Sequence, residues 1–135
     1  YVLHENGLVN AIEELQTKVL TKDFEIIFNL SLDFPDLGKS LEISIFRIIQ
    51  EFVNNSIKHS GAKAVTIDLS NNQESVFLTL KDNGRGFNAE NIENYKGSGL
   101  KNIQNRIDSF KGTIKMNNLK NEGIAFNIIF PIEIE

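Results

Sequence analysis

The chain has 135 residues, of which 41% are hydrophobic, and it contains no cysteine. This length fits a single domain, 1–135, while the lack of cysteine excludes disulfides, zinc–thiolate clusters and a thiol nucleophile. A net charge of −4 argues against a nucleic-acid backbone as the main partner, because binding one requires a basic surface. No apolar run approaches the ~18 residues of a membrane span. We therefore expect a cytoplasmic domain without membrane contact, in a parent protein that could be membrane-anchored.

The first part of the chain has the pattern of a helix, a strand and a second helix. Apolar side chains recur every three or four positions over 8–20, which is the spacing of one helix face. Residues 24–32 alternate like a strand, with Phe24, Ile26, Phe28, Leu30 and Leu32 on one face, and a segment with Asp, Pro and Gly then ends it. A second helical stripe covers 41–52, and Ser60-Gly61 supplies the stop.

The remaining part has the pattern of a hairpin, a polar connection, a helix and a last strand pair. Alternating segments predict the strands, helical spacing predicts the helix, and the lack of apolar anchors predicts a mobile connection. The expected elements are strands 64–70 and 75–81, connection 87–96, helix 100–112, and strands 113–118 and 124–132. This order predicts an α+β fold: a two-layer sandwich of a mixed, mostly antiparallel sheet packed on about three helices.

A first polar cluster lies on the second helix. Glu51, Asn55 and Lys58 stand at i, i+4 and i+7, so we expect them on one helix face. The Asn55 amide oxygen suits Mg²⁺, Lys58 and His59 suit phosphate, and Glu51 either orients a water or accepts a proton. The alternative for Glu51, Asn55 and Lys58 is a solvated helix face with an ordinary charge pair. The alternative for His59 is a histidine at the helix end that faces the C-terminal end of the helix dipole.

The second cluster is Asp82-Asn83-Gly84-Arg85-Gly86-Phe87, at the end of an expected strand. A buried Asp82 would accept a hydrogen bond from an exocyclic amine, which adenine has and guanine lacks at that position. Gly84 and Gly86 permit a close backbone approach to a ligand. The alternative is an ordinary Asp-Asn-Gly turn.

The third cluster, Gly97-Ser98-Gly99-Leu100, directly precedes the third helix. Free N–H groups at a helix start can hold anionic phosphates, although the same glycines could simply cap the helix.

With these clusters in this order, nearly the whole chain resembles the catalytic and ATP-binding domain of bacterial sensor histidine kinases, the Bergerat or HATPase fold. Glu51–His59 resembles that family's N box, Asp82–Phe87 its first glycine box and Gly97–Leu100 its second. The glutamate at the start of the N box and the run Asn6–Ala11 resemble the subfamily that pairs with LuxR-type response regulators.

The resemblance implies ATP and Mg²⁺ as cofactors. Asn55 would coordinate Mg²⁺ and Asp82 would bind the adenine amine, while phosphate contacts would come from Lys58 and His59. The pocket and its lid would be shaped by Gly84, Gly86, Gly97, Gly99 and Leu100. One departure is Ile124, where the family usually has a threonine, so the hydroxyl that the family places near adenine is missing, and a water or the Asp82 carboxylate could take over its contact.

The resemblance also implies partners: a histidine-bearing dimerisation domain of the same protein, for which residues 1–6 would form a linker, and a response regulator. His4 lacks the pattern that flanks an acceptor histidine. The expected activity is transfer of the ATP γ-phosphoryl group to a histidine. The alternatives are a related ATP hydrolase with Glu51 activating water, and a noncatalytic module that binds partners according to nucleotide state.

Overall fold

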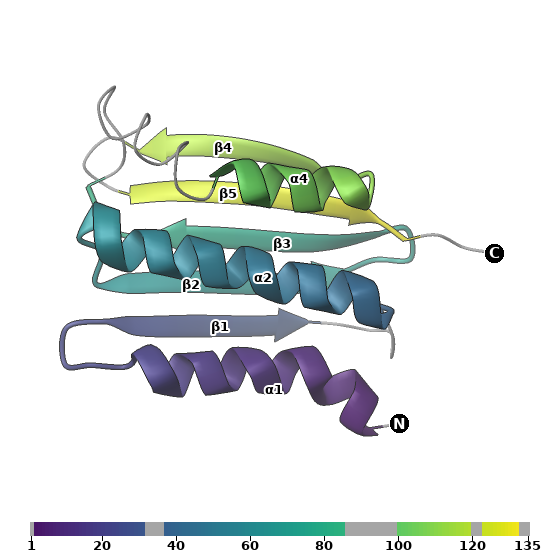
Figure 1. Ribbon diagram of the computed structural model, residues 1–135, viewed down its shortest axis with the longest axis horizontal. Coiled ribbons are helices and arrows are strands. Elements are labelled where there is room, and N and C mark those ends of the chain that lie inside the picture. The colour runs from purple at the N-terminus through teal and green to yellow at the C-terminus, as the bar shows by residue number, and fades with distance from the viewer. Residues whose placement is uncertain (1, 32–36, 86–99, 120–122, 133–135) are drawn as a thin grey trace.

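The computed structural model describes residues 2–31, 37–85, 100–119 and 123–132 (Figure 1). In chain order the elements are α1 (Val2–Val19), β1 (Glu25–Ser31), α2 (Lys39–Asn55), the π-helical turn η1 (Ser56–Ser60), β2 (Ala64–Asn71), β3 (Ser75–Asp82), α4 (Lys101–Ser109), β4 (Thr113–Leu119) and β5 (Gly123–Pro131). No helix in these ranges is both long enough and apolar enough to cross a bilayer.

The strands form one five-stranded sheet in the order β1-β2-β3-β5-β4. β1 pairs with β2 in parallel, because the chain between them crosses over through α2, and the other neighbours are antiparallel. Figure 1 shows α2 in front of β2 and β3, α4 in front of β5 and β4, and α1 beside β1. The predicted α+β sandwich of a mostly antiparallel sheet and helices is confirmed.

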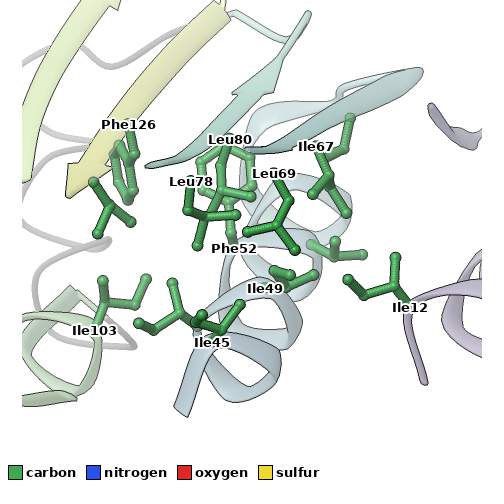
Figure 2. Close-up of a cluster of buried hydrophobic side chains, with 14 of the residues drawn as sticks. Ile12, Ile45, Ile49, Phe52, Ile67, Leu69, Leu78, Leu80, Ile103 and Phe126 are labelled. Carbon is green, nitrogen blue, oxygen red and sulfur yellow. The ribbon is translucent and has the colours of Figure 1, made fainter. Parts of the chain in front are cut away.

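The core lies between α2 and the sheet. Each central strand turns alternate side chains inward, as the period of a strand requires, and α2 turns in its apolar stripe. Figure 2 shows these side chains filling the space between the two layers, with Ile103 of α4 at one side and Ile12 of α1 at the other. Phe52 and Phe126 meet edge to face with ring centroids 5.0 Å apart. Burying such a side chain stabilises the fold by about 1.5–3 kcal/mol, so this layer holds α2 on the sheet.

Apart from the start of α1, the boundaries lie within a few residues of those predicted. On β1 the residues expected on one face become more exposed along the strand: Ile26 is buried, Phe28 is half-buried and Leu30 is 45% exposed. α1 begins at Val2, before the predicted start at residue 8, so it includes residues 2–6. The second helix stops at Gly61, with φ +65°, as expected, but its last turn is π-helical and not α-helical.

The C-terminal end of α4 is a Schellman motif built without glycine at its left-handed position. Lys111 has φ +58° and donates its N–H to the Asp108 carbonyl at 3.0 Å. The N–H of Gly112 reaches the Ile107 carbonyl at 2.9 Å. A Cβ on Gly112 would stand 2.8 Å from the Ile129 carbonyl oxygen, so this residue must be small.

Lys111→Gly should therefore raise the free energy of unfolding by about 0.5–1 kcal/mol, because it relieves the left-handed strain and keeps both hydrogen bonds. Gly112→Ala should lower it by about 1–3 kcal/mol through overpacking. Urea unfolding of both variants measures the two effects. A loss of stability in Lys111→Gly would contradict this account of the helix end.

Candidate functional site

The described parts of the first and second polar clusters lie at one end of the sheet, where α2 runs into η1, β3 ends and β5 begins. Asp82, the last residue of β3, is 2% exposed. Its strand partner on β5 is Ile124, and Ser56, the first residue of η1, approaches from the helix layer. In Figure 1 the ends of α2 and β3 and the start of β5 all lie on the left.

Three hydrogen bonds hold the Asp82 carboxylate. The backbone N–H groups of Gly84 and Ile124 donate to Oδ1 at 3.1 and 3.3 Å, and the Ser56 hydroxyl donates to Oδ2 at 2.8 Å. A buried carboxylate needs such donors to offset the loss of its hydration. The bonds therefore fix an anionic hydrogen-bond acceptor at the end of the sheet.

The Asp82–Gly84 bond makes the start of the Asp-Asn-Gly segment an Asx turn, a geometry that is compatible with both interpretations of this motif. Asn83 extends it: its Oδ1 accepts the N–H groups of Lys63 and Ala64 at 2.8 and 2.9 Å. Its own N–H donates to the Ala64 carbonyl at 3.2 Å. Asn83 thus ties the end of β3 to the start of β2, next to the end of η1.

The start of β5 is pressed against the same turn. Gly123 has φ +110°, and a Cβ there would lie 1.9 Å from the carbonyl oxygen of Asp82. Glycine is required for both reasons, since no L side chain fits the space or the backbone conformation readily. This close approach brings the Ile124 N–H within reach of the carboxylate.

The first cluster spans two kinds of helix. Glu51 and Asn55 lie one turn apart on α2, where Glu51 is half-buried and Asn55 is 4% exposed, whereas Lys58 lies in the π-helical turn η1 and is exposed. In a π turn the successive side chains are spaced differently around the axis than in an α-helix, and the sequence prediction assumed α-helical spacing throughout. The first residue of η1, Ser56, is 2% exposed and contacts Asp82. The backbone of His59 lies in η1, and its side chain is outside the described part of the chain.

The second and third clusters are described only in part. Gly84 lies in the Asx turn. Leu100 immediately precedes α4 and packs, partly buried, against the core. Gly86, Gly97, Gly99 and the connection 87–96 lie outside the described residues.

Sequence reasoning missed Ser56 and the roles of Asn83 and Gly123. A serine in the last turn of a helix has no distinctive pattern, and a π turn has no periodic signal of its own. Asn83 and Gly123 could have been suspected, because Asn and Gly favour turns with side-chain to backbone bonds and left-handed conformations. Their partners lie on other strands, so the contacts themselves could not be predicted.

Residues 40–134 match the family model of histidine kinase-, DNA gyrase B- and HSP90-like ATPases. The chain belongs to this family. The match includes α2, η1 and every strand that contributes to the site.

Individual proteins agree with this assignment. The sensor protein VraS of Staphylococcus haemolyticus is 33% identical over 96% of this chain and 35% of VraS. The sensor histidine kinase ComP of Bacillus subtilis is 32% identical over 98% of this chain and 17% of ComP. The catalytic domain of histidine kinase ThkA superposes with a TM-score of 0.69 at 22% identity, covering 96% of this chain and 94% of that one. The chain thus has the fold of a histidine kinase catalytic domain and spans about a third or less of these two curated relatives.

Gly123→Ala tests whether the close approach of β5 to Asp82 is required. Left-handed strain alone should cost on the order of 1–2 kcal/mol, and overlap with the Asp82 backbone should add about 1–3 kcal/mol. Gly38→Ala is the matched control, because Gly38 also has a positive φ, +86°, but no atom of the described residues lies within 4 Å of the place its Cβ would take. Denaturant unfolding should show a larger loss for Gly123→Ala, and equal losses would contradict the close approach.

Proposed function

We propose that this chain is the ATP-binding catalytic domain of a sensor histidine kinase, which transfers the γ-phosphoryl group of ATP to a histidine on a separate dimerisation domain. The observation that carries the proposal is the buried, three-times hydrogen-bonded Asp82 carboxylate in a chain of this ATPase family. The name of ComP and the fold shared with ThkA support the kinase over other activities of the family.

Asp82 recognises the base in this proposal. A fixed carboxylate accepts hydrogen bonds but cannot donate them, so it favours an exocyclic amine over a carbonyl. Adenine presents an amine at its six position, whereas guanine and hypoxanthine present a carbonyl there. Gly84, held in the Asx turn, leaves the backbone beside the base uncovered by a side chain, and Gly86 continues this segment.

The phosphates and the metal would lie along the end of α2. Among the described residues no group of three His, Cys, Asp or Glu side chains forms a metal cage. The amide oxygen of the buried Asn55 and the Glu51 carboxylate one turn earlier are hard donors, which fit Mg²⁺ because that ion takes few protein ligands and keeps phosphate and water oxygens. Bound there, Mg²⁺ would neutralise phosphate charge.

The chain's own contribution to transfer is positioning and electrostatics, since phosphoryl transfer needs little covalent chemistry from the protein. Asp82 fixes the base, and Lys58 and His59 bring positive charge and a donor to the phosphates. Gly97, Gly99 and Leu100, which precede α4 in the sequence, would bind phosphate through backbone N–H groups. Glu51 orients a water or accepts the proton of the attacking group.

The partners follow from the same proposal. The histidine would come from a dimerisation domain joined through residues 1–6, and the phosphoryl group would pass on to a response regulator. The glutamate that starts the N box, Glu51, together with the run Asn6–Ala11, supports a regulator of the LuxR type. The chain spans 35% of VraS and 17% of ComP, so most of each relative lies outside the matched part.

Asp82→Asn tests recognition of the base. The N–H groups of Gly84 and Ile124 both point at Oδ1, so an asparagine must turn its oxygen toward them and its NH₂ toward the place of Oδ2. The variant then presents a donor to the ligand. We expect ATP affinity to fall by about 10–100-fold. Calorimetry with ATP, GTP and ITP should also show that the preference for ATP over ITP is lost.

Asp68→Asn is the matched control, because Asp68 lies on β2 and bonds Asn29 at 2.7 Å, away from this site. It should bind all three nucleotides like the unmodified chain. Equal affinity of the unmodified chain for ATP, GTP and ITP would contradict the role given to Asp82.

Asn55→Asp tests the proposed metal site separately from recognition of the base. It changes a donor of the metal site and leaves the base contacts in place, so phosphoryl transfer to an added dimerisation domain should fall by about tenfold or more, while adenosine affinity stays within about twofold. Asn54→Asp, on the exposed neighbouring residue, is the control and should transfer normally. If adenosine binding fell as much as transfer, Asn55 would serve the fold and not the metal.

A further inference from the structure

The Ser56 hydroxyl donates to Asp82 across 26 positions of sequence and from the opposite layer of the fold. It lies 2.8 Å from Oδ2, and both residues are 2% exposed. In the site as described above, this contact has no task separate from holding the carboxylate. The backbone N–H groups of Gly84 and Ile124 already bind the other oxygen, Oδ1.

The Ser56 bond to Oδ2 restricts the rotation of the Asp82 carboxylate. The torsion that rotates an aspartate carboxylate is broad, so bonds to one oxygen fix the position of that oxygen better than the plane of the group. A donor on Oδ2 supplies a second fixed point. Because the Ser56 hydrogen is directed at Asp82, the hydroxyl presents lone pairs, and not a donor, to any other neighbour.

We propose that Ser56 is a positioning residue that fixes the plane of the Asp82 carboxylate and thereby sets the preference of the site for an amine over a carbonyl on the bound base. This inference rests on the proposed nucleotide site. Ser56 itself acts through Asp82 and needs no contact with the ligand.

The strand that pairs with β3 offers the carboxylate no side-chain hydroxyl at the position opposite Asp82. Ile124 is the strand partner of Asp82, and its side chain is 2% exposed. Directly opposed residues of antiparallel strands have Cβ atoms about 4.5–5.5 Å apart, so a hydroxyl on the side chain at 124 would be within reach of the carboxylate. The isoleucine provides none. The π turn η1 supplies a hydroxyl from the other side by placing Ser56 there.

The first test is Ser56→Ala, with ATP and ITP affinities measured by calorimetry. The two nucleotides differ only in an amine or a carbonyl at the position that Asp82 is proposed to read. We expect ATP affinity to fall about three- to tenfold and ITP affinity to stay within about twofold, so that the ATP:ITP ratio falls. Ser44→Ala, at another buried serine of α2, is the control and should leave both affinities unchanged.

The second test restores a hydroxyl from the opposite strand. In the Ser56→Ala background, Ile124→Thr should recover most of the lost ATP:ITP ratio, whereas Ile124→Val, of the same shape as threonine but without the hydroxyl, should not. Ser56→Cys, which keeps the size with a weaker donor, should give an intermediate ratio. It replaces Ser56→Ala in the comparison if melting curves show that the alanine variant does not fold.

The outcomes distinguish this inference from the proposed function. If the unmodified chain prefers ATP to ITP but the variants at Ser56 keep that preference, Ser56 has no positioning role and the nucleotide site stands. An equal fall for both nucleotides, with a lowered melting temperature, would assign Ser56 to the fold and overturn the inference. Failure of the unmodified chain to bind ATP would overturn the proposed function itself.

Discussion

The buried carboxylate of Asp82 is the constraint on which the end of this domain is built. A carboxylate that is 2% exposed loses its hydration, and donors from the protein must replace it. They come from three separate segments: the turn after β3, the start of β5 and the first residue of η1. Two features bring the Ile124 N–H to the Asp82 carboxylate: the pairing of β5 with β3 and the close approach of Gly123. The π turn after α2 brings the Ser56 hydroxyl to the same carboxylate.

The packing between the two layers stabilises the fold, and the polar groups lie at the ends of the packed elements. The apolar stripe of α2 and the inward side chains of the central strands hold the layers together, as the contact of Phe52 with Phe126 illustrates. Polar groups gather where this packing ends, at the last turn of α2 and the end of β3. Because the core fixes both elements, the polar side chains at their ends are preorganised, which is what electrostatic recognition and phosphoryl transfer require.

Much of this arrangement could be predicted. Apolar periodicity indicated the helices and strands within a few residues, and residue chemistry singled out Asp82 and Asn55, which the structure places at the same end of the sheet. The prediction assumed α-helical geometry from Glu51 to Lys58, and it did not include the π-helical turn that holds Lys58. The alternation over 24–32 predicted one face of a strand, but it could not show how much of that face is covered, and Leu30 is 45% exposed near the end of the edge strand β1.

The sequence by itself determined the elements, the layered fold class and the residue types available for chemistry, because periodicity and turn preference are local properties of the chain. Only the tertiary structure decided which groups surround Asp82. Its contacts with Ser56 and Ile124 join residues 26 and 42 positions apart. Such contacts depend on strand register and on how α2 packs over the sheet. Register and packing are set by which side chains fill the whole core, and no single segment determines them.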